Sequence, residues 1–142
     1  MKKYRLIKVC LLSMFLLFGT VNCKKVKEDL AMKYITSIMT DGRWIVDEFT
    51  DNNVDIAPEF IGYEFQFVSD GKVQAYYNGS QTQGTWEGNV SDTTIYSNFP
   101  SATEPLIRLN DTWKFINSTT RSVEVAPFNT GRTAYLKLVK KS

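Results

Sequence analysis

Five carboxylates between residues 47 and 59 are the first side chains in this sequence that could do chemistry. Clustered carboxylates can bind calcium or act together as a general acid and base. The spacing here lacks the regular ligand positions and the central glycine of an EF-hand loop. We therefore interpret Thr50–Glu59 as a solvated acidic loop, and we predict neither a metal site nor a catalytic pair. The five residues are Asp47, Glu48, Asp51, Asp55 and Glu59.

The chain has no histidine, and its two cysteines are Cys10 and Cys23. Histidine is the commonest general base and the commonest metal ligand, so its absence removes the Ser-His-Asp and Cys-His mechanisms. No cysteine follows Cys23, which leaves the rest of the chain without a disulfide, a thiol nucleophile or a zinc thiolate site. We expect a protein that is not an enzyme and that uses no cofactor.

Aromatic residues in strand-like segments are the second group of candidates. Aromatic side chains that line a barrel could bind a lipid, a pigment or the face of a sugar. A barrel of about eight strands can also be just wide enough for its own side chains, so core filling is the favoured interpretation. Because Tyr76 and Tyr77 are adjacent and face opposite sides of a strand, we expect at least one of them to be exposed. The candidate ligand contacts are Tyr63, Phe65, Phe67, Tyr77, Trp86 and Trp113.

The segment Lys24–Met39 predicts a helix, because its apolar residues recur at intervals of three and four. We expect this apolar face to pack on the core. Thr40, Asp41 and Gly42 predict the end of the helix. The apolar face consists of Val26, Leu30, Tyr34 and Ile38, with Ala31, Ile35 and Met39 beside them.

After Gly42 the apolar period changes to two, which is typical of antiparallel strands. Asp70-Gly71 and Asn78-Gly79 predict tight hairpin turns, whereas Leu106–Leu109 fits either a short strand or a helical turn. Seven or eight short strands indicate an all-β fold, and a closed barrel is favoured because closure leaves no exposed strand edge. The expected strands are Trp44–Phe49, Gly62–Phe67, Lys72–Tyr77, Gln81–Glu87, Thr93–Ser97, Thr112–Ile116, Ser122–Ala126 and Thr133–Val139.

Residues 1–22 have the order of a secretory signal, with a basic start, an apolar run over Val9–Phe18 and a short polar segment before Cys23. The run is about half the roughly 20 residues that a membrane span needs. The segment that ends at Cys23 resembles the lipobox of bacterial lipoproteins. The resemblance implies a lipidated Cys23, with palmitate among the acyl chains, that anchors the protein in the bacterial cell envelope at the outer membrane. A cleaved, unlipidated secreted protein is the alternative.

The formal net charge of +2 depends on the signal. The chain has 17 Lys and Arg against 15 Asp and Glu, and four of the basic residues lie within residues 1–22, which leaves 13 and a net charge of −2. The basic footprint of a nucleic-acid-binding protein is therefore missing. Lys24, Lys25 and Lys27 follow the anchor and are expected near lipid headgroups. The roughly 120 residues after the signal suit a single domain.

Several short motifs together resemble the small lipocalin-like domains of bacterial lipoproteins. The likeness covers residues 35–140. It implies an up-and-down β-barrel preceded by a helix, in which Trp44 packs across the barrel floor under the helix and Gly42 permits the close turn. It divides the chain into a signal (1–22), a lipidated linker and helix (23–41) and a barrel (42–142). The motifs are Gly42-Arg43-Trp44, Asp70-Gly71, Gly84-Thr85-Trp86, Trp113 and Tyr135-Leu136-Lys137-Leu138.

Three functions are compatible with these residues. The resemblance implies a lipid-anchored protein that binds a small hydrophobic or amphipathic molecule. The alternative is a filled barrel that contacts an envelope protein or a saccharide through the loops Thr50–Glu59 and Phe99–Pro105. A hydrolase would require two facing carboxylates about 5 to 10 Å apart, and it is the least favoured of the three.

Overall fold

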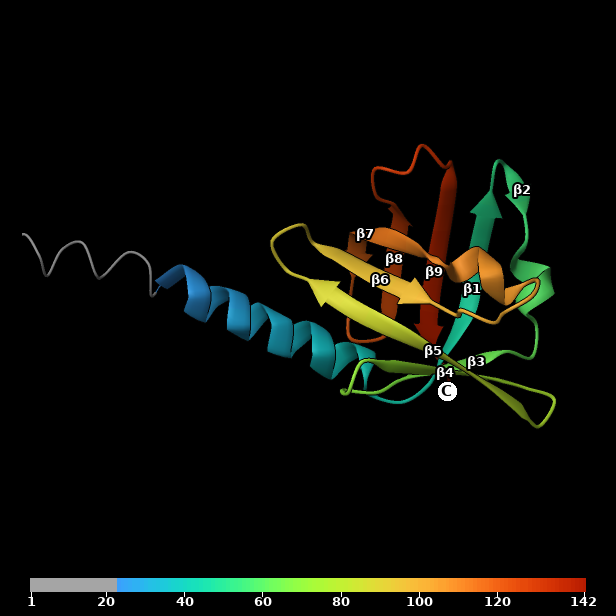
Figure 1. Ribbon diagram of the computed structural model, residues 1–142, viewed down its shortest axis with the longest axis horizontal. Helices are drawn as coiled ribbons and strands as arrows, with labels where there is room; N and C mark the ends of the chain where they lie inside the picture. Colours follow the sequence, from blue (N-terminus) through green and yellow to red (C-terminus); the bar gives the residue numbers. More distant parts are fainter. Residues whose placement is uncertain (1–22) are drawn as a thin grey trace, which may run out of the picture.

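The computed structural model describes residues 23–142, in which one helix leads into an antiparallel β-barrel (Figure 1). The predicted signal, residues 1–22, lies outside the described residues. The helix spans residues 23–39. Gly42 follows it with a φ of 76°, a left-handed conformation that glycine adopts without steric cost. Within residues 23–142, no helix has the length and apolarity needed to cross a bilayer.

Eight strands close the barrel, which confirms the predicted all-β, up-and-down architecture. Each strand from β3 onward pairs antiparallel with the next, and β9 pairs back with β1 to complete the ring. β1 meets β3 at a single register pair, Trp44 with Phe65. β2 pairs with the end of β1 as an additional strand. The strands are β1 (Trp44–Asp51), β2 (Val54–Asp55), β3 (Glu64–Phe67), β4 (Lys72–Tyr77), β5 (Ser80–Asn89), β6 (Thr94–Asn98), β7 (Asp111–Ser118), β8 (Ser122–Pro127) and β9 (Ala134–Lys140).

Two hairpins turn on a pair of adjacent residues that both have positive φ. Asn78 and Gly79, with φ of 48° and 77°, form the predicted β4–β5 turn, and this pair of conformations is typical of a type I′ hairpin. Asn52 and Asn53, with φ of 49° and 64°, form the β1–β2 turn in the same way. This second hairpin was not predicted, since Thr50–Glu59 was expected to be a loop throughout.

Two further segments differ from the sequence-based expectation. Leu106–Leu109, which the pattern left open, is a 3-10 helix, η2. β5 continues through Gly88 to Asn89, although Gly88 was expected to end it. A Cβ at Gly88 would lie 3.3 Å from the sulfur of Met32, so this glycine makes room for the helix rather than for a turn.

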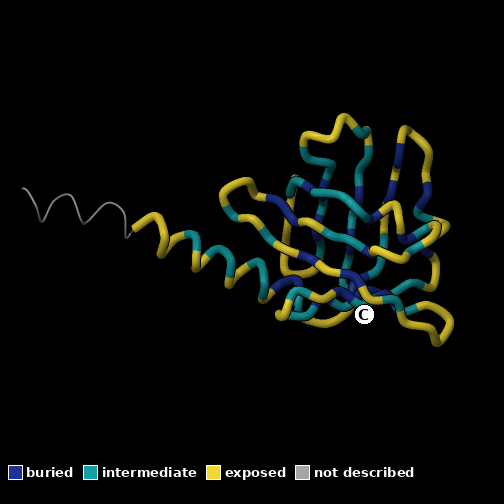
Figure 2. Tube along the Cα trace, viewed as in Figure 1, coloured by how far each residue is buried: buried dark blue, intermediate teal, exposed yellow. Residues whose placement is uncertain are grey.

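Apolar packing closes both ends of the barrel, and Figure 2 shows the buried residues concentrated along the strands. At one end the helix buries Ile38 and Met39. Trp44 lies beneath them, fully buried, and its indole N–H donates a hydrogen bond of 2.9 Å to the Met39 carbonyl. At the other end, the 3-10 helices η1 (Ala57–Phe60) and η2 bury Phe60 and Leu106 among other side chains.

The helix does not bury the apolar row that the sequence analysis assigned to the core. Val26, Leu30 and Tyr34 are 56%, 60% and 57% exposed, and Ile38 and Met39 in the last turn are the two buried residues of the described helix. Figure 1 shows the reason, because the helix meets the barrel at its C-terminal end and its N-terminal half extends away from the strands. The expected packing of this row was therefore wrong for all but Ile38.

Candidate functional site

The barrel interior is filled by its own side chains. The remaining internal space is about 40 Å³, whereas pockets that hold small molecules usually measure about 300 to 1,000 Å³. Among the candidate ligand contacts, Phe65, Phe67 and Trp113 border this space and are 2%, 7% and 2% exposed. Trp86 meets Phe67 edge to face at 5.6 Å, and its N–H donates to the Val68 carbonyl at 2.8 Å. The structure places these four aromatic residues in the core.

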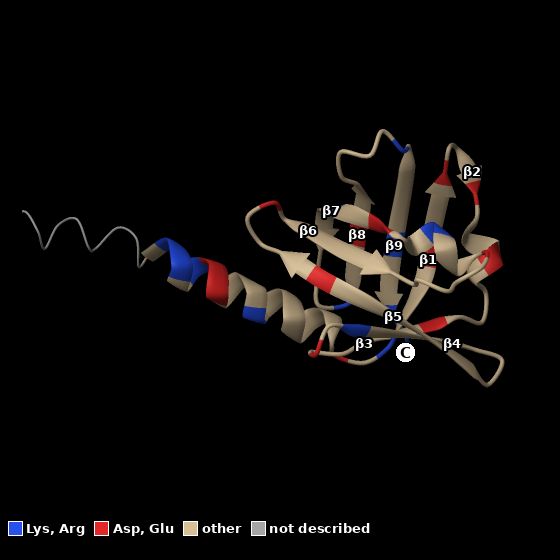
Figure 3. Ribbon diagram, in the orientation of Figure 1, with Lys and Arg blue, Asp and Glu red and all other residues tan. Residues whose placement is uncertain are grey.

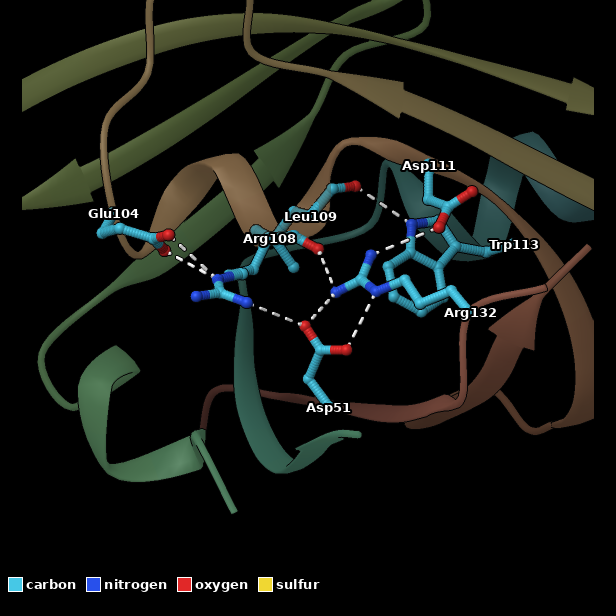
Figure 4. Close-up of polar contacts among 7 residues, drawn as sticks. All are labelled: Asp51, Glu104, Arg108, Leu109, Asp111, Trp113 and Arg132. Carbon is cyan, nitrogen blue, oxygen red and sulfur yellow. Dashed lines mark hydrogen bonds and ion pairs between the residues drawn. The ribbon is translucent and has the colours of Figure 1, made fainter. Parts of the chain in front are cut away.

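Charged side chains cover the end of the barrel that carries η2 (Figure 4). Arg132 donates from Nε and Nη2 to the two carboxylate oxygens of Asp51, at 3.1 Å and 2.8 Å. Arg108 donates to the same carboxylate at 3.2 Å. The Arg132 guanidinium also donates to Asp111 at 3.2 Å and lies 5.3 Å from the centre of the Trp113 ring. A molecule entering the barrel here would have to displace this network.

The electrostatics of this network favour a structural role. The hydrogen bonds from Arg132 are the main cause that lowers the pKa of Asp51 below 3.8, and Arg108 lowers it further against the opposing effect of burial. Burial lowers the pKa of Arg132, but its bonds to Asp51 and Asp111 outweigh burial and raise it overall. A carboxylate held ionised between two guanidinium groups is a poor proton donor and a weak base.

Three other acids of the predicted acidic cluster have partners outside the Asp51 network. Asp47 and Glu48 both pair with Lys137, at 2.9 Å and 3.3 Å. Asp55 accepts a hydrogen bond of 3.0 Å from the backbone N–H of Ala57. Across residues 23–142, no group of three or more acidic, cysteine or histidine side chains is placed to hold a metal ion. The five acids therefore do not form one site.

A groove of about 390 Å³ lies on the outside of the barrel, beside the β4–β5 hairpin. It combines tyrosine rings with charged and hydroxyl-bearing side chains and with the exposed backbone of the hairpin turn. Its polar lining and its position on the outside distinguish it from the apolar interior of the barrel. Its side chains include Arg43, Glu64, Tyr76, Tyr77, Ser80 and Gln81.

A stack of aromatic rings holds Tyr77 at the rim of this groove. Tyr77 is 40% exposed, and its ring lies parallel to that of Tyr63 at 4.4 Å between centroids. Tyr63 in turn stacks on the buried Phe65 at 6.2 Å. A Cβ at Gly62 would lie 3.3 Å from the Tyr77 ring, so this glycine lets the ring approach the backbone closely. The stack fixes an exposed ring on a rigid support.

On the other side of β4, the side chains of Arg43 and Glu64 carry the charges of the groove. The Arg43 guanidinium lies 4.2 Å from the centre of the Tyr76 ring and donates to Glu64 at 2.7 Å. Lys141 pairs with the second oxygen of Glu64. Its hydrogen bond, followed by that of Arg43, lowers the pKa of Glu64 below 4.5. The groove therefore offers the ring of Tyr77 on one side of β4 and charged hydrogen-bonding groups beside Tyr76 on the other.

Tyr63 and Tyr77 were predicted as ligand contacts among the barrel aromatics, whereas Arg43 and Glu64 were not predicted. Arg43 was considered only as the middle residue of a motif. Its position beside Glu64 follows from the register that pairs Trp44 with Phe65, and β1 and β3 share only that one pair. A local sequence pattern does not predict a strand pairing that consists of one residue pair.

Comparisons with known proteins support the barrel fold and do not indicate a biochemical activity. No known protein family matches the sequence, and no curated protein matches it. Among solved structures, the crystal structure of a DUF4847 family protein from Bacteroides vulgatus superposes with a TM-score of 0.59 and 16% sequence identity, covering 75% of this chain and 97% of that chain. At this identity the likeness concerns the fold alone. Fold and site together define a small closed antiparallel barrel with a filled interior and an external groove.

Proposed function

We propose that this chain is a lipid-anchored, non-enzymatic protein of the bacterial cell envelope that binds an envelope saccharide in the groove beside the β4–β5 hairpin. The observation that carries the proposal is the exposed ring of Tyr77 in an external groove of about 390 Å³, against an internal space of about 40 Å³. A second external groove, of about 400 Å³ between the helix and β5, contains no tyrosine ring. A barrel that is filled and covered at both ends has to bind its partner on its surface.

The chemistry of the groove supports a saccharide over an apolar ligand. Sugars present an apolar C–H face together with hydroxyl groups, so a site for them combines an aromatic ring with polar groups. The exposed ring of Tyr77 supplies the flat surface. The ion pair of Arg43 and Glu64 supplies donors and an acceptor that can bind hydroxyl groups.

Anchoring through Cys23 and the lipocalin-like class of the domain belong to the same proposal. They rest on the lipobox-like segment that ends at Cys23 and on the motifs around Trp44, Trp86 and Trp113. A non-enzymatic role is supported by the absence of histidine from the chain and by the ion pairing of Asp51, Asp47 and Glu48. A small hydrophobic ligand inside the barrel is less well supported, because it would require several core aromatic residues to move.

The test is to screen the protein against an array of bacterial envelope saccharides and to titrate any saccharide that binds by calorimetry. We expect Tyr77→Ala to weaken binding at least tenfold, which is about 1.4 kcal/mol. Tyr96→Ala is the matched control, because Tyr96 is 43% exposed and lies on β6, outside the groove. Equal binding by both variants would contradict the assignment of the groove.

Native mass spectrometry distinguishes this proposal from an internal ligand. We expect the folded protein, purified from bacterial cells, to carry no non-covalent guest. An additional mass that disappears on unfolding would instead identify a molecule held inside the barrel. Denatured intact mass gives the acyl groups on Cys23 independently of either result.

A further inference from the structure

The exposed face of the N-terminal helix has a regular composition. Val26, Leu30 and Tyr34 follow one another at intervals of four residues and are all more than half exposed. We call these three residues the outer stripe. Residues four apart in a helix lie one above the other, so the outer stripe is a continuous apolar ridge about two turns long.

The barrel packs mainly on the opposite side of the helix, and of the ridge only Tyr34 borders a hollow, of about 160 Å³, that it shares with Phe115 and Val123 of the barrel. Met32 and Ile35 lie over Gly88 of β5, and Met39 enters the core. Their intervals of three and four residues place them on one side of the helix, and at 100° per residue this side is about opposite to the outer stripe. The helix is therefore apolar on two faces, and within residues 23–142 the barrel covers one of them while Val26 and Leu30 on the other stay exposed.

Cys23 lies on the same side of the helix as the outer stripe. Val26 and Leu30 are three and seven residues beyond it, which corresponds to about one and two turns. Residue 23 is already helical, so the thiol and the ridge belong to one helix with no linker between them. Acyl chains attached to this thiol would leave the helix on the side that carries the outer stripe.

Lysines border the outer stripe on both sides. At 100° per residue, Lys27 lies beside Leu30 and Tyr34 on one flank, and Lys33 lies beside Val26 and Leu30 on the other. Both lysines are exposed, as are Lys24 and Lys25 in the first turn. Figure 3 shows basic bands along this part of the helix, with one acidic band between them. An apolar ridge flanked by lysines is the pattern of a helix that lies in the surface of an anionic membrane.

We propose that the outer stripe inserts into the lipid surface, so that the helix lies along the membrane and holds the barrel against it. This inference deepens the proposed function and rests on its lipid anchor. A second copy of the chain is a weaker occupant, because three half-exposed side chains supply far less than the roughly 800 Å² per partner of a stable interface. A helix standing upright on the anchor would instead place the barrel about 25 Å from the bilayer and leave the stripe in water.

The experiment uses the lipidated full chain, extracted from bacterial membranes and reconstituted into vesicles of phosphatidylcholine with about one third phosphatidylglycerol. Tyr34→Trp places a fluorescent probe in the outer stripe. The native Trp44, Trp86 and Trp113 are 0%, 6% and 2% exposed, so the unsubstituted protein supplies a constant background. We expect the emission of the new tryptophan to shift to shorter wavelength and to be quenched by brominated acyl chains.

Two matched variants sharpen this test. Ile107→Trp places the probe at a 46% exposed position on η2, at the opposite end of the barrel, and it should stay unquenched. Adding Val26→Ser and Leu30→Ser to the Tyr34→Trp chain should reduce the quenching of the probe at least twofold. Both positions are exposed, so the barrel should fold as before, and near-ultraviolet circular dichroism verifies that it does.

A probe at position 34 that stays solvent-exposed and unquenched would overturn the proposal. So would a blue shift without vesicles that is lost on dilution, because a second copy would then cover the stripe. If intact mass shows no acyl group, the lipid anchor of the proposed function fails separately. The same probe on the purified chain mixed with the vesicles then tests whether the outer stripe binds lipid by itself.

Discussion

Arg132 binds both carboxylate oxygens of Asp51, although the two residues are 81 positions apart in the sequence. The pair joins the loop before β9 to the end of β1, and Arg108 adds a contact from η2. Asp51 is 5% exposed, which makes it the most deeply buried charged group of the network. Three segments meet at this carboxylate, and Arg132 strengthens the junction through bonds to Asp111 and to the Arg108 carbonyl.

Removing this carboxylate should destabilise the barrel. We expect Asp51→Ala to lower the free energy of unfolding by about 2 to 3 kcal/mol, because it leaves Arg132 partly buried without its main partner. Arg108→Ala is the control, since Arg108 is 44% exposed and exposed pairs contribute little. Urea unfolding followed by tryptophan fluorescence measures both. Equal losses for the two variants would show that Asp51 is no more important than a surface contact.

The contribution of Asp51 should also depend on pH. Its pKa in the folded protein is lowered below 3.8, chiefly by the hydrogen bonds from Arg132. A group with a depressed folded pKa stabilises the protein above its unfolded pKa and loses this effect as the pH falls through the folded pKa. The stability difference between the wild type and Asp51→Asn should therefore be constant from pH 7 to about pH 5 and shrink below about pH 4. A difference that persists unchanged at pH 2 would contradict this origin.

The period-two patterns predicted most of the strands, because a strand with one buried face alternates apolar and polar residues. The dipeptides Asn-Gly and Asp-Gly predicted the turns between them, because they favour tight hairpins. The β1–β2 hairpin was missed since Asn52-Asn53 lacks the glycine that marks such turns. The exposed outer stripe was also missed, because an apolar face has the same period whether it packs on protein or on lipid.

The candidate site was less predictable than the fold. Tyr77 could be selected because Tyr76 and Tyr77 face opposite ways in any strand. The nearly full interior could not be predicted, because it depends on how Phe65, Phe67 and Trp113 pack. Composition does not determine that packing. The Arg43–Glu64 pair depends on a one-pair register between β1 and β3, which is beyond the reach of a local pattern.

Trp44 is predicted to matter through its indole N–H as well as through its volume. Trp44→Phe should lower the free energy of unfolding by about 2 to 3 kcal/mol, since it leaves a small cavity and removes the bond to the Met39 carbonyl. Hydrogen exchange at residues 35–39 should accelerate in this variant, because the end of the helix loses its attachment to the barrel. Tyr96→Phe, a change at a 43% exposed ring, should leave both measurements unaltered. Unchanged exchange at the helix end would mean that apolar contacts alone hold it.

Two glycines of β5 should respond differently to the same added methyl group. A Cβ at Gly84 would lie 2.5 Å from the backbone oxygen of Asn98 and 2.8 Å from the ring of Phe99, so β6 or the following loop must move. A Cβ at Gly88 would lie 3.3 Å from the flexible thioether end of Met32. We expect Gly84→Ala to destabilise the barrel by about 1 to 3 kcal/mol and Gly88→Ala to change its stability by less than about 1 kcal/mol. Thermal unfolding of both variants checks this order, and the reverse order would place the tight contact between the helix and β5 instead of inside the barrel.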